Sequence, residues 1–345
     1  MNERQLGTAP IHVSAIGLGT MTFGEQNTEA EAHAQLDRAL ERGVTLIDAA
    51  EMYPVPPMAE TCGLTETMIG NWLAARGNRD RIVLASKAAG PGNGMPWIRG
   101  GRSDHTAEHL NAAIDATLAR LKTDYVDLYQ LHWPARSTNF FGRLGYAPED
   151  DEPPVNLVAT LEAARDLIDA GKIRYLGVSN ETPWGVMTFV KLAEAMSLPR
   201  VVSIQNPYSF LNRSFEVGLA EVAIRERVPL LAYSPLAFGM LTGKYQDNPG
   251  APGRLNAFTR FQRYTTPNGR LASAEYVAIA RDRGLSPAQM AIAYAMSRPF
   301  CASVLIGATT MAQLDENLDA ADLVLDDDTL AAIEDVHARY PVPCP

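Results

Sequence analysis

The segment YVDLYQLH, residues Tyr125–His132, is a short run of aromatic and apolar residues that ends on a polar side chain. Such a run predicts a buried β-strand with His132 at its C-terminal end. Most runs of this kind are followed by a segment with helical periodicity, so the sequence predicts a parallel sheet covered by helices. The other strand candidates are Ala15–Gly19, Val44–Asp48, Ile82–Lys87, Arg174–Ser179, Val201–Gln205, Pro229–Tyr233 and Ser303–Gly307.

Segments with helical periodicity alternate with these strands. In Thr106–Leu121, the residues Leu110, Ile114 and Leu118 recur every four positions and form one apolar stripe, while Thr106 can cap the first turn. A glycine follows several segments, as Gly43 does, which is typical of a helix end. The predicted helices are Glu29–Arg42, Thr65–Arg76, Thr106–Leu121, Leu157–Ala170, Trp184–Met196, Phe215–Arg227 and Met311–Leu318.

An open doubly wound sheet and a closed eight-stranded barrel both fit this alternation, and the polar residues decide between them. They follow the C-terminal ends of many different strands, which converge on one mouth only in a barrel. We therefore predict an α/β fold of the (β/α)₈ TIM-barrel class, formed as a single domain by residues 1–345. The strand-end residues are Asp48, Lys87, His132, Ser179, Asn180, Gln205, Tyr233, Ser234 and Gly307.

Additional elements are expected outside the eight repeats. Arg4–Leu6 and Ile11–Val13 predict an N-terminal β-hairpin that plugs the barrel floor. An extra helix is predicted within Arg281–Pro299 and a tail helix at Leu330–Arg339. Long loops usually bind ligands or cover a site. Two such loops, after the fourth and seventh strands, are Pro134–Asn156 and Ala237–Gly269.

Composition and charge argue against several classes of function. The chain has 345 residues, with 30 Lys and Arg against 40 Asp and Glu, and this net charge of −10 disfavours a nucleic-acid partner. Its three cysteines lack zinc spacing, and their odd number is typical of a reduced cytoplasmic protein. Neither a signal peptide nor a membrane-spanning apolar run is expected. No metal site is expected either, because the pair His105 and His109 has no third ligand.

Four residues at or just beyond strand ends form a set suited to carbonyl reduction: Asp48, Tyr53, Lys87 and His132. Transfer of hydride to a carbonyl requires a proton donor to the oxygen, and a free tyrosine, with a pKa of about 10, exchanges protons poorly near neutrality. We expect Lys87 to lower the pKa of Tyr53, Asp48 to keep Lys87 charged, and His132 to orient the carbonyl. Any one of them alone is more often structural, but four together at one rim indicate chemistry.

Longer motifs around these residues resemble the aldo-keto reductase superfamily. The segment TLIDAAEMY, Thr45–Tyr53, is similar to its Asp-to-Tyr motif. Tyr125–Pro134 and Ile173–Asn180 resemble its fourth-strand and fifth-strand signatures. The likeness extends from Leu18–Met21 to Glu316 and Asn317, and the loops are most similar to the bacterial Tas-like and potassium-channel β-subunit-like branches.

The resemblance implies an NAD(P)H-dependent oxidoreductase that reduces a small aldehyde or ketone to an alcohol, with Tyr53 as the general acid. It also implies that Ser179, Asn180 and Gln205 hold the nicotinamide carboxamide, while Tyr233 stacks on the ring. The full set of expected cofactor-binding residues is Thr20, Met21, Asp48, Ser179, Asn180, Gln205, Tyr233, Ser234, Pro235, Leu236, Lys244, Arg254, Gly307, Thr309, Gln313, Glu316 and Asn317.

Within this set, Lys244 and Arg254 are the cations expected at the phosphates, and the eighth strand and its helix would bind the adenosine end. Many family members carry lysine and arginine where this chain has Gly307 and Gln313, and those cations hold the 2′-phosphate. The channel-subunit-like branch has the same replacements and still resembles an NADPH binder. NADPH is therefore expected, with NADH the less favoured cofactor.

The expected substrate pocket is apolar, with Phe23, Tyr53, Trp97 and Trp133 beside Met21. The sequence leaves two other functions open. One is an NADP(H)-binding regulatory or redox-sensing protein with slow or incidental turnover, as channel β-subunits suggest. The weaker one is a metal- or phosphate-dependent barrel lyase. The sequence also leaves the oligomeric state open.

Overall fold

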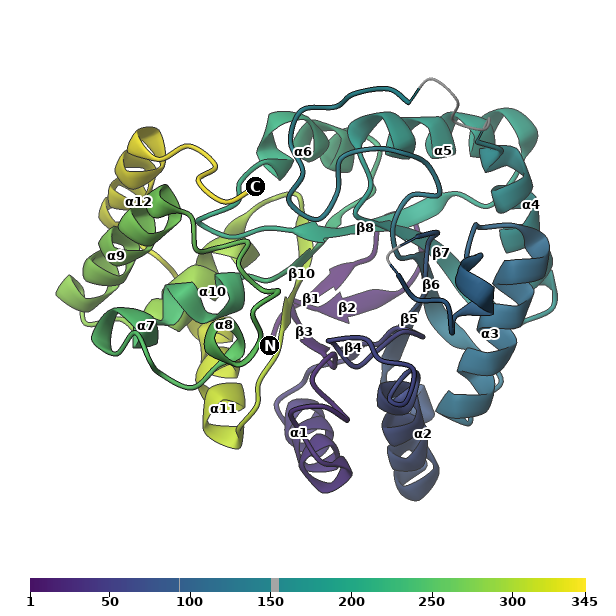
Figure 1. Cartoon of the computed structure of the whole chain (residues 1–345), viewed down its shortest axis with the longest axis horizontal. Coiled ribbons are helices and arrows are strands. Elements are labelled where there is room, and N and C mark those ends of the chain that lie inside the picture. Colours follow the sequence, from purple (N-terminus) through teal and green to yellow (C-terminus); the bar gives the residue numbers. More distant parts are fainter. Residues whose placement is uncertain (93, 150–154) are drawn as a thin grey trace.

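The computed structural model of the chain describes residues 1–92, 94–149 and 155–345. Eight parallel strands form a closed barrel in the order β10-β3-β4-β5-β6-β7-β8-β9, with helices around it (Figure 1). This confirms the predicted (β/α)₈ barrel. Each observed strand overlaps a predicted one: β3 Ile16–Gly19, β4 Leu46–Asp48, β5 Val83–Ala88, β6 Val126–Leu131, β7 Ile173–Ser179, β8 Val201–Pro207, β9 Leu230–Tyr233 and β10 Cys301–Ile306.

Helices follow the strands and cover the outside of the barrel. The predicted caps are observed: the Thr106 side chain accepts a hydrogen bond from the His109 N–H, and Gly43 adopts a left-handed φ of 83° after the first helix. The helices that match predictions are α1 Glu29–Glu41, α2 Leu64–Arg76, α3 Ala107–Leu121, α4 Leu157–Asp169, α5 Pro183–Met196, α6 Phe215–Arg225, α10 Pro287–Ser297, α11 Met311–Asp319 and α12 Asp327–Arg339.

The hairpin of β1 (Glu3–Gln5) and β2 (His12–Ser14) lies inside the ring of strands in Figure 1. Its apolar residues, Leu6, Ala9 and Val13, form one buried cluster with residues that point into the barrel from six strands. Gly7, at its turn, has a φ of 61°, and a Cβ there would lie 2.3 Å from the Val202 carbonyl oxygen. The hairpin therefore plugs the barrel floor, as predicted, and leaves the opposite end for the strand-end side chains.

The long segment after β9 is more ordered than the sequence indicated. The expected loop Ala237–Gly269 contains three short helices, and the longer helix α9 was not among the predicted elements. A threonine–proline pair begins α9, where the Thr266 side chain accepts from the Gly269 N–H. This start signal, followed by an apolar stripe at helical spacing, could have identified it. The additional elements are η3 Ala237–Thr242, α7 Lys244–Asp247, α8 Arg254–Ala257 and α9 Pro267–Asp282.

The other expected loop, Pro134–Asn156, is described only in part, because residues 150–154 lie outside the described ranges. Its described portion contains no helix or strand. Across the described ranges, no helix combines the length and apolar character that crossing a bilayer requires.

Candidate active site

The Lys87 side chain is the centre of the polar cluster at the mouth. It is fully buried, and its Nζ lies 2.5 Å from Asp48 Oδ2, 2.9 Å from the Ala49 carbonyl oxygen and 3.4 Å from the Tyr53 hydroxyl. Parallel pairing places the ends of β4 and β5 side by side, so the Asp48 and Lys87 side chains meet at the same end of the barrel. One ammonium group thus contacts both the carboxylate and the phenol.

Two glutamine side chains hold the other oxygen of Asp48. Gln205 Nε2 donates to Asp48 Oδ1 at 2.8 Å, and Gln130 Nε2 donates to the same atom at 3.1 Å. Thr20 contacts the backbone here, since its hydroxyl donates to the Asp48 carbonyl oxygen at 2.8 Å. The Asp48 carboxylate is therefore held in one orientation, with Lys87 as its partner on the side of Tyr53.

His132 follows β6 and stands against Tyr53 across the mouth. The two ring centroids are 5.8 Å apart in an edge-on arrangement, and both residues are less than a tenth exposed. Burial lowers the pKa of His132 well below its ordinary value, and the charge of Lys87 acts in the same direction. The imidazole is therefore neutral at neutral pH and can donate or accept one hydrogen bond without carrying charge. We name Asp48, Tyr53, Lys87 and His132 the mouth tetrad.

The direction of the Tyr53 pKa differs from the sequence expectation. Burial raises the pKa of the phenol above its ordinary value of 10.0, and the nearby charge of Lys87 offsets this rise only in part. Burial also acts to lower the pKa of Lys87, but the charges of Asp48 and ionised Tyr53 outweigh it, and the net pKa of the amine is raised. Lys87 is therefore charged, and Tyr53 is a protonated phenol near neutrality.

The residues expected at the nicotinamide form a second polar group beside the tetrad. The Ser179 hydroxyl donates to the Gln205 carbonyl oxygen at 2.8 Å, and Asn180 Nδ2 donates to the His132 carbonyl oxygen at 2.9 Å. Asn180 has a left-handed φ of 53°, and its Oδ1 accepts from the Tyr233 hydroxyl at 2.6 Å. Four expected cofactor residues from three strand ends are thus brought together next to His132.

The expected phosphate cations come from the short helices after β9. Lys244 begins α7 and Arg254 begins α8, and among the described residues no carboxylate contributes to the pKa of either side chain. Burial lowers the pKa of Lys244, and the charge of Arg254 lowers it further. Gly253 packs closely against α7, since a Cβ there would lie 2.5 Å from Lys244 Nζ and from the Tyr245 hydroxyl. Preceding them, Ser234 has a left-handed φ of 56°, Pro235 is buried and Leu236 is half-buried.

At the adenosine end, the expected residues surround the start of α11. Gly307 is exposed, and its carbonyl oxygen accepts from Asn317 Nδ2 at 3.3 Å. Gln313 Oε1 accepts from both the N–H and the hydroxyl of Thr309, each at 3.0 Å. Glu316 instead accepts from the Ser286 hydroxyl at 2.7 Å, so its carboxylate is turned toward α10.

The expected substrate pocket is only partly realised. Phe23 and Trp133 have 0% and 1% of their surface exposed, because Phe23 packs in the main core and Trp133 packs in a smaller cluster with Ala89, Met95 and Ile98. Their side chains therefore offer no surface that a substrate could touch. Trp97, in contrast, is 38% exposed, and Met21 is half-buried. Of the expected aromatic wall, Tyr53 and Trp97 are the side chains with accessible surface.

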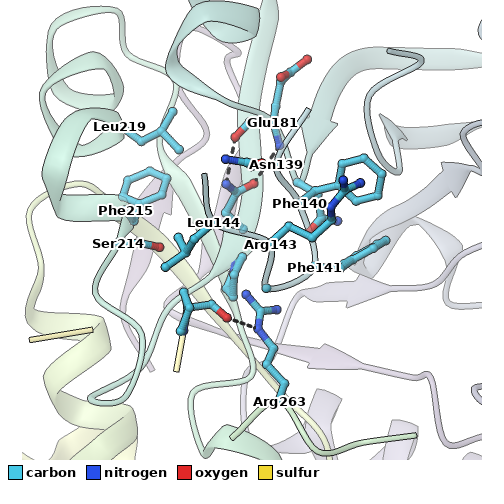
Figure 2. Close-up of a pocket in the computed structure, with 15 residues that line it drawn as sticks. Asn139, Phe140, Phe141, Arg143, Leu144, Glu181, Ser214, Phe215, Leu219 and Arg263 are labelled. Carbon is cyan, nitrogen blue, oxygen red and sulfur yellow. Dashed lines mark hydrogen bonds between the residues drawn. The ribbon is translucent and has the colours of Figure 1, made fainter. Parts of the chain in front are cut away.

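A cavity beside the mouth contains a cation that the sequence interpretation did not include. It lies between residues 139–144, the start of α6 and the last residue of the chain, and Arg263 reaches into it (Figure 2). Arg263 Nε donates to the Pro345 carbonyl oxygen at 2.6 Å. Burial raises the pKa of Tyr233, and the charge of the nearby Arg263 guanidinium offsets this rise only in part. None of the mouth tetrad lines this cavity.

The histidine pair that suggested metal spacing is separated by burial. His105 is 6% exposed, and burial lowers its pKa to about 4, whereas the His109 side chain pairs with Asp104. His105 is therefore a buried neutral histidine. Among the described residues, no three His, Cys, Asp or Glu side chains gather where they could hold a metal ion.

Sequence reasoning also missed Gln130, although its position carried a signal. Leu128 points into the barrel interior with the plug residues. Because side chains alternate along a strand, Gln130, two residues later, points to the same side and reaches Asp48. Glu51 and Arg99 were missed as well, and no local pattern identifies their contact, since they are 48 positions apart.

The family model for the aldo/keto reductases matches residues 15–338. Protein tas of Escherichia coli (strain K12) is 54% identical over 100% of both chains. The uncharacterized oxidoreductase YrpG of Bacillus subtilis (strain 168) is 30% identical, over 97% of this chain and 96% of the relative. L-glyceraldehyde 3-phosphate reductase of Escherichia coli (strain K12) is 29% identical, over 93% of this chain and 87% of the relative. With the barrel and the mouth tetrad, these matches show that the chain belongs to the aldo/keto reductase family of oxidoreductases.

Proposed function

We propose that the protein reduces an aldehyde or ketone to an alcohol with NADPH, using Tyr53 as the general acid. One observation carries this proposal: a single buried ammonium, Lys87, contacts the Asp48 carboxylate at 2.5 Å and the Tyr53 hydroxyl at 3.4 Å. A phenol held beside a cation can give up its proton to an oxygen that is gaining negative charge. The free thiols of Cys62, Cys301 and Cys344 fit a reducing compartment, and we propose the cytoplasm.

The roles of the four side chains follow from their contacts. When bound, a nicotinamide cofactor supplies the hydride that reaches the carbonyl carbon. Tyr53 gives its proton to the carbonyl oxygen, and Lys87 stabilises the phenolate that forms. Asp48 holds Lys87 in place and charged, while His132, neutral and edge-on to Tyr53, orients the carbonyl oxygen. The overall change is one hydride and one proton added across the carbon–oxygen double bond.

The chain's own residues fit a dinucleotide. Lys244 and Arg254 are two neighbouring cations without carboxylate partners in the described ranges, and the pKa of each is lowered by burial. Both side chains are half-buried, and a pyrophosphate supplies the negative charge that such a pair of cations attracts. Ser179, Asn180 and Gln205 provide amide and hydroxyl groups for a carboxamide. We propose NADPH over NADH, with Gln313 and Thr309 nearest to the 2′-phosphate.

A direct assay tests the proposal. The purified wild-type protein should oxidise NADPH in the presence of aromatic and aliphatic aldehydes, and the alcohol should form in equal amount. L-glyceraldehyde 3-phosphate, named in one relative, belongs in the substrate panel. Failure of every aldehyde and ketone while NADPH binds tightly would reject the reductase function. Capture of a partner protein that depends on NADPH would then support the regulatory alternative.

The pH dependence of kcat follows from the direction of the Tyr53 pKa. A general acid works in its protonated form, so reduction should be fast below its pKa and decline above it. Because burial raises the pKa of Tyr53 above 10.0, kcat should stay level from neutrality through mildly alkaline pH. His132 adds no titration step to the kcat profile near neutrality, because burial holds its pKa well below the ordinary value for histidine. Steady-state kcat measured across this range checks the prediction, and a decline centred near neutrality would contradict it.

Substitution of either phosphate cation should weaken cofactor binding. Lys244→Met and Arg254→Met each remove one charge-assisted contact, so Kd for NADPH should rise roughly tenfold or more, and the increase should shrink at high salt. Gln313→Ala should weaken the binding of NADPH but not the binding of NADH. Fluorescence titration with both cofactors measures the effects. Arg225→Gln, at an exposed ion pair on α6, is the matched control and should leave both Kd values unchanged.

A further inference from the structure

The backbone leaves the sheet just after β7, at the residues expected to hold the nicotinamide. The register of β7 with β8 ends at Ser179 and Gln205, and Asn180 then takes a left-handed φ of 53°. Residues other than glycine adopt this conformation at a cost, although asparagine tolerates it better than most. In the described part of the chain, no backbone group is hydrogen-bonded to the N–H or C=O of Glu181, the next residue. These two groups therefore need partners from a side chain.

The side chain of Asn206 supplies both partners. Its Oδ1 accepts from the Glu181 N–H at 3.2 Å, and its Nδ2 donates to the Glu181 carbonyl oxygen at 3.0 Å. Side chains alternate along β8, so Gln205 reaches Asp48 in the mouth while Asn206 points to the other side and reaches Glu181. An amide side chain carries the donor and the acceptor of a peptide unit. Asn206 thus continues the pairing of the two strands by one residue beyond the end of β7.

Asn180, which this pairing holds in place, connects two proposed functional groups. Its Nδ2 donates to the His132 carbonyl oxygen at 2.9 Å, and its Oδ1 accepts from the Tyr233 hydroxyl at 2.6 Å. Tyr233 is the ring expected to stack on the nicotinamide, and His132 belongs to the mouth tetrad. The direction of a side chain depends on the φ and ψ of its own residue. The bonds between Asn206 and Glu181 fix the peptide that follows Asn180, and they therefore help to fix where the Asn180 amide points.

We propose that Asn206 is a positioning residue for the nicotinamide end of the cofactor: its amide keeps Asn180 in the left-handed conformation that places the Asn180 side chain beside the Ser179 hydroxyl. Asn180 Nδ2 donates to that hydroxyl at 3.1 Å. This inference rests on the proposed NADPH-dependent function. A site that is already ordered binds the nicotinamide without an ordering cost, whereas a loose Asn180 has to be fixed by each cofactor molecule that binds. Asn206 acts through Glu181 and not through contact with the ring.

The test variant is Asn206→Leu, which keeps the approximate size of the side chain and removes both hydrogen bonds to Glu181. The fold should be retained, because the buried Glu181 carboxylate stays anchored by two bonds from Arg136, at 2.7 and 2.6 Å. The matched control is Asn71→Leu on the outside of the barrel. Asn71 is also half-buried, and its Nδ2 joins two elements by donating from α2 to the Glu29 carboxylate of α1.

Two ligands separate the nicotinamide end from the rest of the cofactor. NADPH contains the nicotinamide, and 2′-phospho-ADP-ribose is the same molecule without that ring. Isothermal titration calorimetry of Asn206→Leu should show Kd for NADPH raised roughly tenfold and Kd for 2′-phospho-ADP-ribose unchanged, because only the ring site is loosened. Hydrogen exchange at the Glu181 amide should also speed up by about tenfold, since its acceptor is gone. Asn71→Leu should change neither Kd and leave this exchange rate as it is.

The outcomes separate the role of Asn206 from the proposed function. Equal weakening of both ligands in Asn206→Leu would overturn the positioning role, because the residue would then support the fold in general. An unchanged Kd for NADPH would overturn it as well. A wild type that binds NADPH but reduces no carbonyl compound would reject the reductase function, while the two Kd values would still decide the role of Asn206. A wild type that binds no NADPH would reject the proposed cofactor and the positioning role together.

Discussion

Replacing Tyr53 with phenylalanine is expected to lower kcat for carbonyl reduction by roughly 10²- to 10⁴-fold, the contribution of a well-placed general acid. The substitution removes only the hydroxyl. The ring keeps its edge-on contact with His132 at a centroid distance of 5.8 Å. Lys87 retains its bonds to Asp48 and to the Ala49 carbonyl oxygen, so no buried charge loses its partner. Steady-state NADPH oxidation with an aldehyde measures the loss.

Two controls show whether the loss is chemical. The Tyr53→Phe variant should bind NADPH with unchanged Kd, because the hydroxyl is not among the expected cofactor contacts. Its free energy of unfolding should change by no more than about 1 kcal/mol, the value of one net hydrogen bond. Turnover close to that of the wild type would show that another group donates the proton.

Replacing Lys87 with methionine is expected to have the largest effect on stability as well as to abolish reduction. Lys87 is fully buried, and its removal leaves the Asp48 carboxylate buried with amide donors from Gln130 and Gln205 but no cation. Breaking a buried ion pair in this way costs about 3–5 kcal/mol. Urea unfolding measures the free energy, and the same protein is assayed for aldehyde reduction.

The double variant Lys87→Met with Asp48→Asn separates the two effects. Neutralising both partners removes the unpaired buried charge, so most of the lost unfolding free energy should return. Activity should not return, because Tyr53 then has no cation to stabilise its phenolate. Recovery of turnover together with stability would mean that Lys87 serves only the fold.

The sequence was sufficient for the barrel because the relevant patterns are local. Each strand shows its own apolar run, each helix its own spacing of three and four, and parallel strands place every C-terminal end at one rim. The hairpin of β1 and β2 was recognisable for the same reason. Helix α9 obeys these local rules too, so its omission reflects an overlooked signal and not a missing one.

The identity of the mouth tetrad was likewise available from the sequence, since Asp48, Tyr53, Lys87 and His132 stand in motifs of distinctive composition. The pKa shifts of these side chains could not be predicted from the sequence. The sequence predicted a lysine near the tyrosine, but the pKa of Tyr53 depends most on how completely its side chain is buried. Burial is a property of every segment packed around a side chain, so the sign of the shift appeared only in three dimensions.

What the sequence by itself determined is therefore the order of strands and helices, the plugged floor and the residue types at the mouth. The tertiary structure alone decided which side chains touch and which are buried. It placed the two glutamines on Asp48, buried Phe23 and Trp133, and paired Glu51 with Arg99. The physical reason is that periodicity and capping act within a few residues, whereas desolvation and ion pairing depend on groups that the chain brings together from tens of positions away.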